Sequence, residues 1–180
     1  MQAATRSYQK GYTALQSLIV MAIIGILTTI GLPSFRALIE WQRAQARLHL
    51  LTAHLATARS LAVAQRLPVS ICPSVDGASC RSDTNWSQGW ILFQDPLRNG
   101  HPAGADSILR VERYAASDNI SITGTIGRPV VRFLPNGRNS GTNITISLCA
   151  GAHRLADVIV NNSGRTRSVR YKQPTNCPMH

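Results

Sequence analysis

The sequence predicts an α+β fold in which one long N-terminal α-helix packs against a mostly antiparallel β-sheet domain. Two observations lead to this prediction. Apolar residues follow a helical pattern through about residue 66, and beyond it short β-branched runs alternate with turn residues. The chain of 180 residues has room for one such domain with a buried core.

The first part of the predicted helix carries no charge. Residues 12–32 contain no charged side chain and lie between Lys10 and Arg36, and about 20 helical residues cross the hydrocarbon core of a bilayer. A secretory signal peptide would have a shorter apolar region followed by a small-residue cleavage site, and neither is evident. We therefore expect residues 12–33 to form a transmembrane helix that the mature protein keeps.

Residues 34–66 are expected to continue this helix as an amphipathic segment. Polar side chains lie between the apolar ones, so one face needs to be covered, most simply by the sheet that follows. The apolar residues recur at steps of three and four positions: Trp41, Ala44, Leu48, Leu51, Leu55, Ala58 and Ala62.

Residues 67–180 are expected to form a single β domain outside the cytoplasm. Asp-Pro, Asn-Gly, Pro-Asn-Gly and Asn-Ser-Gly clusters separate its apolar runs and are typical of turns. The predicted strands are 68–72, 89–94, 107–114, 119–123, 129–134, 143–149, 154–161 and 165–172.

The composition is strongly basic, with a formal net charge of +11. Arginine dominates the excess, and a guanidinium group can bind a phosphate through two parallel hydrogen bonds. A polyanionic partner, nucleic acid or membrane headgroups, is one interpretation, and a basic surface that only confers solubility is the other. The excess is concentrated late in the chain, at Arg128, Arg132, Arg138, Arg154, Arg165, Arg167, Arg170 and Lys172, with Asp157 as the acidic residue among them.

Four cysteines, Cys72, Cys80, Cys149 and Cys177, contain no Cys-x-x-Cys pair. In a chain exported past the inner membrane, disulfides are the expected chemistry. Of the three possible pairings we choose Cys72–Cys80, which closes a short polar loop, and Cys149–Cys177, which fastens the C-terminal tail. The spacings match no common zinc site, so we expect no metal.

No catalytic motif is evident. The carboxylates are scattered, and neither a phosphate-binding loop nor a nucleophile elbow is present. His49 and His54 are five positions apart on a helix, so they do not share a face as metal ligands would, and we expect them at the surface. Trp86 and Trp90 flank an apolar strand and are interpreted as core residues. We therefore expect neither enzymatic activity nor a cofactor.

The segment 158–172 is the strongest candidate for a binding site. Two β-branched runs flank residues 161–164, which predicts a β-hairpin in which Gly164 supplies a positive φ. Arg165 and Arg167 leave the same face of an extended strand roughly 7 Å apart, which suits successive phosphates of one nucleic-acid strand. An alternative is that the arginines only protect a sheet edge from aggregation. The candidate DNA-binding residues are Gly164, Arg165, Arg167, Arg170, Lys172 and Arg154.

The start of the chain resembles a type IV prepilin. A basic leader ends in Lys10-Gly11-Tyr12, and the apolar run that follows leads to Pro33. The resemblance implies that residues 1–11 are a leader, which a prepilin peptidase removes after Gly11 before Tyr12 is N-methylated. Gln16 stands where the family has a glutamate that can pair with a neighbouring subunit's terminus. An amide offers only a hydrogen bond, which indicates a low-copy or tip position.

Three further stretches, 55–72, 86–95 and 131–141, resemble the GspH/FimT family of minor pilins and pseudopilins. The resemblance implies a type IV pilin-like fold. It also implies a single-pass location in the bacterial inner membrane before assembly, and then a place in the pilus between the periplasm and the cell surface. The expected protein partners are other minor pilins, the major pilin and the prepilin peptidase.

Residues 164–167 match the Gly-Arg-x-Arg motif of FimT-type pilins. That resemblance implies capture of extracellular double-stranded DNA during natural transformation, by phosphate contacts that tolerate any sequence. Two alternatives stay open. One is a minor pseudopilin of type II secretion, similar to GspH, and the other is a structural subunit that initiates pili for adhesion or twitching motility.

Overall fold

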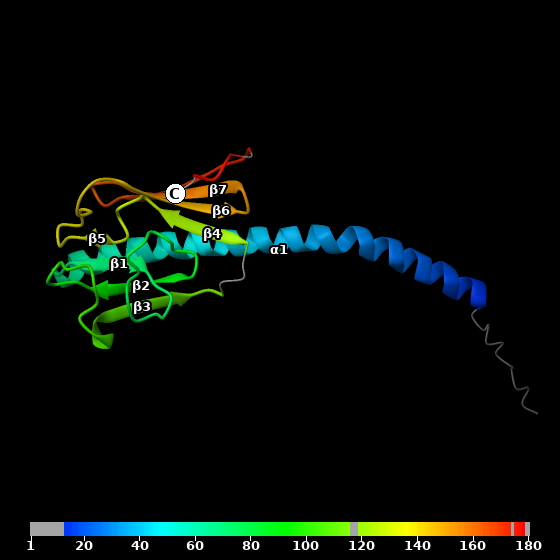
Figure 1. The fold of residues 1–180 in the computed structure, drawn as a ribbon, viewed down its shortest axis with the longest axis horizontal. Coiled ribbons are helices and arrows are strands. Elements are labelled where there is room, and N and C mark those ends of the chain that lie inside the picture. Colours follow the sequence, from blue (N-terminus) through cyan, green and yellow to red (C-terminus); the bar gives the residue numbers. More distant parts are fainter. Residues whose placement is uncertain (1–12, 116–118, 174, 179–180) are drawn as a thin grey trace, which may run out of the picture. The chain divides into compact units, whose positions relative to one another are not determined.

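The computed structural model describes residues 13–115, 119–173 and 175–178 (Figure 1). The chain divides into two compact units, Met1–Ile39 and Glu40–His180. Helix α1, Ala14–Gln65, contributes residues to both. The predicted leader 1–11, its cleavage site after Gly11 and the methylation site Tyr12 lie outside the described residues.

In the first unit, α1 begins with a capping box. The Thr13 backbone N–H donates to Gln16 Oε1 at 3.0 Å, and the Gln16 backbone N–H donates to Thr13 Oγ1 at 3.4 Å. Within the described residues, no helix combines the length and the apolar character that crossing a membrane requires. The structure therefore shows a helix from Ala14 onward within the predicted transmembrane segment 12–33, but it does not confirm a membrane span.

In the second unit, α1 buries one face in a hydrophobic core. The predicted apolar stripe is confirmed from Ala44 onward, whereas Trp41 is 54% exposed. Arg66, with φ 54°, follows the last helical residue, and Pro68 cannot continue a helix. The stripe residues exposed by at most 1% are Ala44, Leu48, Leu51, Leu55, Ala58 and Ala62.

Two four-stranded antiparallel sheets share this core with α1, so the predicted α+β fold is confirmed. The first, in the order β3-β2-β1-β5, contains β1 (Val69–Pro73), β2 (Gly89–Gln94), β3 (Ile108–Arg113) and β5 (Val131–Phe133). The second, in the order β4-β6-β7-β8, contains β4 (Ile120–Gly124), β6 (Ile144–Ala150), β7 (His153–Val160) and β8 (Thr166–Arg170). A short 3₁₀ helix, η1 (Ala105–Ser107), precedes β3. Each predicted strand is present.

The position of β2 between two apolar clusters explains why its sequence is continuously apolar. Trp90 and Leu92 face the main core, whereas Ile91 and Phe93 join a smaller cluster with Cys72 on the other face of the sheet. Because both faces are covered, no polar alternation appears along this strand. Trp86 and Trp90 are completely buried, as predicted.

Two disulfides join the cysteine pairs chosen from the sequence. Cys72 and Cys80 have Cα atoms 5.6 Å apart, and Cys149 and Cys177 have Cα atoms 6.2 Å apart. The tail is also held by its backbone, because the Cys177 N–H donates to the Ala152 carbonyl at 3.1 Å. The second disulfide therefore fastens a tail that already pairs with the start of β7.

Candidate functional site

The turn between β7 and β8 requires glycine at position 164 for two reasons. Gly164 has φ 77°, the positive φ that the sequence predicts, and its N–H donates to the Asn161 carbonyl at 2.9 Å. A Cβ at this position would also overlap the Gly137 carbonyl oxygen. Gly164 is buried, so it shapes the hairpin and offers no side-chain contact to a ligand.

Asn162 docks the turn onto the segment between β5 and β6. Its carbonyl accepts from the Asn139 N–H at 3.1 Å, and its own N–H donates to Asn143 Oδ1 at 2.9 Å. Its side chain donates to the Gly141 carbonyl at 2.7 Å and accepts from the Arg138 guanidinium. The turn is thus held by four hydrogen bonds through one residue.

Arg165 follows this docked turn directly, and Arg167 lies two residues further on, in β8. Both side chains are exposed, and neither makes a hydrogen bond or ion pair with any residue that the structure describes. They line a pocket of about 350 Å³ with Asn143, Ile159 and Asn161. The pocket therefore combines two unneutralised guanidinium groups with amides and has no acidic side chain in its lining.

Arg154, at the other end of β7, is occupied by an internal ion pair. Its Nε donates to Asp157 Oδ1 at 2.7 Å, and its guanidinium lies over the Tyr171 ring at 5.1 Å. Tyr171 donates its hydroxyl proton to Asp157 at 2.7 Å, and this hydrogen bond raises the pKa of Tyr171. Asp157 is 3% exposed. We therefore drop Arg154 from the candidate binding residues, because its charge is neutralised.

Arg170 and Lys172 do not join the pocket. Arg170 pairs with Ala156 across the strands, and its guanidinium lies 2.9 Å from His49 Nε2 on α1. Lys172 is exposed and follows the C-terminal end of β8, which is the end away from the turn. Of the predicted set, the structure brings together Arg165 and Arg167.

Other arginines of the basic segment also serve the fold. Arg128 donates to the carbonyls of Thr142 and Ser140, each at 2.7 Å, and burial lowers the pKa of Arg128. Arg132 donates to the buried Asp95 at 2.7 Å. The basic composition therefore overstates the positive charge available to a partner.

His54 is a correction to the sequence analysis, which places it at the surface. Its side chain is 12% exposed, and Nδ1 accepts a hydrogen bond from Trp90 Nε1 at 3.0 Å. Burial lowers the pKa of His54, and the nearby Glu112 opposes that shift. His54 thus accepts the hydrogen bond of the buried Trp90 indole N–H. The helical pattern of the sequence alone does not reveal this role. Among the described residues, no cluster of His, Cys, Asp or Glu could hold a metal ion.

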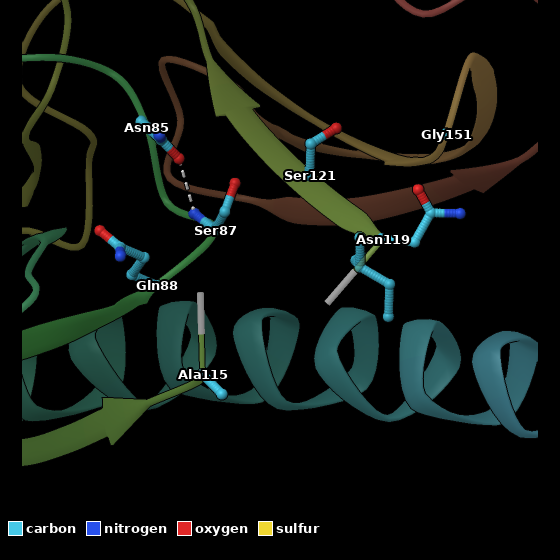
Figure 2. A pocket seen from close by; sticks show the side chains of 8 residues that line it. Asn85, Ser87, Gln88, Ala115, Asn119, Ser121 and Gly151 are labelled. Carbon is cyan, nitrogen blue, oxygen red and sulfur yellow. Dashed lines mark hydrogen bonds between the residues drawn. The ribbon is translucent and has the colours of Figure 1, made fainter. Parts of the chain in front are cut away.

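A second, polar pocket of about 420 Å³ opens beside β4 (Figure 2). Asn85 Oδ1 accepts from the Ser87 N–H at 3.0 Å at its rim. Amide and hydroxyl groups supply its polar side chains, so it offers no acid, base or activated nucleophile. Its lining residues are Asn85, Ser87, Gln88, Ala115, Asn119, Ile120, Ser121 and Gly151.

Comparison with protein families identifies the chain. The model of the family described as type II transport protein GspH matches residues 48–164, which is more than half of the sequence. The protein belongs to the GspH family. This GspH-family protein is a type IV minor pilin or pseudopilin of the GspH/FimT kind.

The fold is similar to that of solved structures. Two crystal structures of the type IV minor pilin FimU from Pseudomonas aeruginosa are similar, each at 22% identity, with TM-scores of 0.60 and 0.57. They cover 77% and 74% of this chain and 98% and 99% of FimU. The minor pseudopilin EpsH from the type 2 secretion system of Vibrio cholerae has a TM-score of 0.47 at 12% identity, covering 72% of this chain and 98% of EpsH. The likeness to FimU shows a shared fold.

The family match ends at Gly164. Arg165 and Arg167 therefore lie just outside the segment that defines this GspH-family protein. The match covers β7 and the turn but not β8, the second strand of the hairpin.

Proposed function

We propose that this GspH-family protein is a minor type IV pilin that binds extracellular double-stranded DNA through the β7–β8 hairpin, for DNA uptake in natural transformation. One observation carries the proposal. Arg165 and Arg167 share one pocket, are exposed, and have no partner among the described residues. Two such guanidinium groups suit the phosphates of a nucleic-acid backbone.

The pocket lining favours phosphates over bases. Its side chains are two guanidiniums, two amides and Ile159, and it contains no aromatic ring on which a base could stack. Strand β8 is a sheet edge and offers no helix to a major groove. Binding is therefore independent of sequence and falls steeply with salt.

The docked turn reduces the cost of binding. Asn162 holds the backbone, so binding orders chiefly the two arginine side chains, at about 0.5–1.5 kcal/mol each. Two phosphate contacts still give weak affinity. Several subunits or further basic loops acting on one duplex would supply avidity.

The proposal includes assembly into a pilus. Residues 12–33 anchor the protein in the inner membrane, and a prepilin peptidase removes residues 1–11 before Tyr12 is methylated. The uncharged run and the exposed apolar side chains of the first unit, among them Leu15, Leu18 and Met21, support this part. The protein then joins other minor pilins and the major pilin.

The family match favours one alternative, a minor pseudopilin of type II secretion. In that role the same domain contacts other pseudopilins or an exported protein, and DNA has no part. The alternative assigns no function to unpartnered arginines at positions 165 and 167, whereas DNA binding does.

A titration of the purified protein, kept in a nonionic detergent, against a labelled duplex of arbitrary sequence tests the proposal. We compare it with Arg165→Gln/Arg167→Gln and with a control that removes the same charge from exposed positions of β3, Arg110→Gln/Arg113→Gln. Anisotropy at two salt concentrations gives the affinity and its salt dependence, and circular dichroism verifies each fold.

We expect salt-sensitive binding that the hairpin variant loses and the β3 control keeps. The salt slope should fall by about 0.9 for each phosphate contact removed. Equal loss in both variants would show that only net charge matters. Absence of binding by the unaltered protein at low salt would leave the secretion role as the better explanation.

A further inference from the structure

The hairpin turn shares one end of the second unit with three other connecting segments. Val69, the first residue of β1, lies opposite Gln94 at the end of β2 and Phe133 at the end of β5. The segment after β5 contains Gly137, whose carbonyl accepts from Arg59 Nε on α1 at 3.0 Å and adjoins Gly164. We call this the distal end, where α1 finishes and where residues 65–68, 95–100, 134–138 and 161–165 meet (Figure 1).

The distal end carries an unusual pair of backbone conformations. Among the described residues, the non-glycine residues with positive φ are Arg66, at 54°, and Arg98, at 55°. A Cβ makes this left-handed conformation costly, and glycine or asparagine is the usual choice. Both positions hold arginine instead, so each carries a backbone cost, and strain of this kind is concentrated at functional sites.

The turns that carry these arginines are neighbours. The Asp95 N–H donates to the Pro68 carbonyl at 2.8 Å, and Gln94 Nε2 donates to Gln65 Oε1 at 2.9 Å. Arg66 follows Gln65 directly, and the Arg98 N–H donates to the Asp95 carbonyl at 3.1 Å. One backbone hydrogen bond and one side-chain hydrogen bond therefore join the turns that carry the two arginines.

Asp95 makes the second turn rigid. Its carboxylate is 1% exposed and accepts from Ser70 Oγ at 2.8 Å, the Asn99 N–H at 3.0 Å and Arg132 Nε at 2.7 Å. The only acidic group of these two turns is thus buried and already paired with Arg132. It leaves the charge of Arg98 unneutralised.

Both side chains are available to a partner. Arg66 and Arg98 are exposed, and neither makes a hydrogen bond or ion pair within the described part of the chain. The carboxyl end of α1 favours a positive charge at Arg66 through the helix dipole. No helix end accounts for Arg98 in the same way.

We propose that Arg66 and Arg98 form a second phosphate-binding pair, which extends the DNA-binding surface from the hairpin turn across the distal end to the first sheet. This inference rests on the proposed function and names where the additional backbone contacts lie. Arg66, Arg98 and Arg165 lie on held turns at the same end of the unit, and Arg167 shares a pocket with Arg165, so one duplex lying across that end contacts four guanidinium groups. The ligand chemistry is again the phosphodiester backbone of duplex DNA.

The test compares four forms of the full-length protein in nonionic detergent: unaltered, Arg66→Asn/Arg98→Asn, Arg66→Lys/Arg98→Lys, and Arg165→Gln/Arg167→Gln. Asparagine removes the charge and tolerates the left-handed backbone, whereas lysine keeps the charge and the strain. Each form is titrated with a duplex at two salt concentrations, and its thermal midpoint is measured.

We expect the asparagine variant to bind at least about threefold more weakly, with a salt slope lower by about 0.9 per lost contact. Its thermal midpoint should be equal or higher, and the lysine variant should keep the salt slope of the unaltered protein. Weaker binding together with a lower midpoint would instead assign the arginines a structural role and overturn the inference.

Other outcomes separate this inference from the proposed function. Unchanged binding in the asparagine variant, with loss in the hairpin variant, would overturn the inference and leave the hairpin as the receptor. Loss in the asparagine variant with full binding in the hairpin variant would overturn the hairpin proposal alone.

Discussion

The two ends of the β7–β8 hairpin use arginine in opposite ways. At the turn, Arg165 and Arg167 are exposed and unpartnered within the described residues. At the far end, Arg154 is held by the buried Asp157 beneath the Tyr171 ring. The difference teaches that the position of an acidic partner, rather than the density of basic residues, decides which arginines can meet a ligand.

The largest effect is expected from removing Asp157, the acidic partner of Arg154. Asp157→Ala leaves Arg154 and the Tyr171 hydroxyl without their acceptor, and breaking a buried ion pair from one side costs about 3 kcal/mol of unfolding free energy. Arg165→Ala, at the turn, should change it by no more than about 0.5 kcal/mol. Urea unfolding of both variants measures the difference. Similar urea midpoints for the two variants would show that the Arg154–Asp157 ion pair contributes no more to stability than the exposed Arg165 side chain does.

A substitution at Gly164 tests whether the close approach of the turn to Gly137 contributes to stability. We expect an effect of intermediate size on the free energy of unfolding. Gly164→Ala combines a positive φ with overlap at the Gly137 carbonyl and should cost about 2–3 kcal/mol. Gly127 has φ 74° with open space around it, so Gly127→Ala reports the backbone cost alone, about 1 kcal/mol. Chemical denaturation compares the two. Equal costs would show that the close approach contributes nothing.

The smallest effect concerns His54, a polar group of α1 that is held by a hydrogen bond from Trp90 of the first sheet. Burial keeps the folded-state pKa of His54 below its ordinary value of 6.5, so the unfolded chain binds the proton more readily. The contribution of His54 to the free energy of unfolding is therefore fully present above pH 6.5. It declines as the pH falls from there through the lower folded-state pKa.

His54→Gln keeps an acceptor for Trp90 Nε1 and removes the titration. Thermal midpoints at pH 7.5 and 5.5 should differ less for this variant than for the unaltered protein. His49→Gln, at an exposed position, is the control. An unchanged pH dependence in His54→Gln would assign the acid sensitivity to another group.

Local patterns were enough to predict most of the fold. The three- and four-residue steps from Ala44 to Ala62 predict the buried face of α1, because a helix brings those positions to one side. Strand ends agree within two residues, since Gly, Asn and Pro mark the turns. Both cysteine pairs also follow from loop lengths and tail position.

The site was predicted less well, because it depends on contacts between distant segments. Residues three apart on a regular strand face opposite sides, yet an irregularity opposite Cys149 lets Arg154 and Asp157 meet. The partners of Arg170 and His54 likewise come from other elements. Such pairings leave no periodic signal, so the sequence overestimates the number of available arginines.

The placement of α1 against strands from the end of the chain has a kinetic consequence. Arg59 bonds to a residue 78 positions away, and the contact of His49 with Arg170 spans 121 positions. Because such contacts form only after long loops have closed, we expect folding to take on the order of milliseconds to seconds. Until strands of the two sheets have packed on α1, the stripe containing Leu48, Leu51 and Leu55 stays open to solvent. An incompletely folded chain would therefore depend on a chaperone or on rapid completion of folding to avoid aggregation.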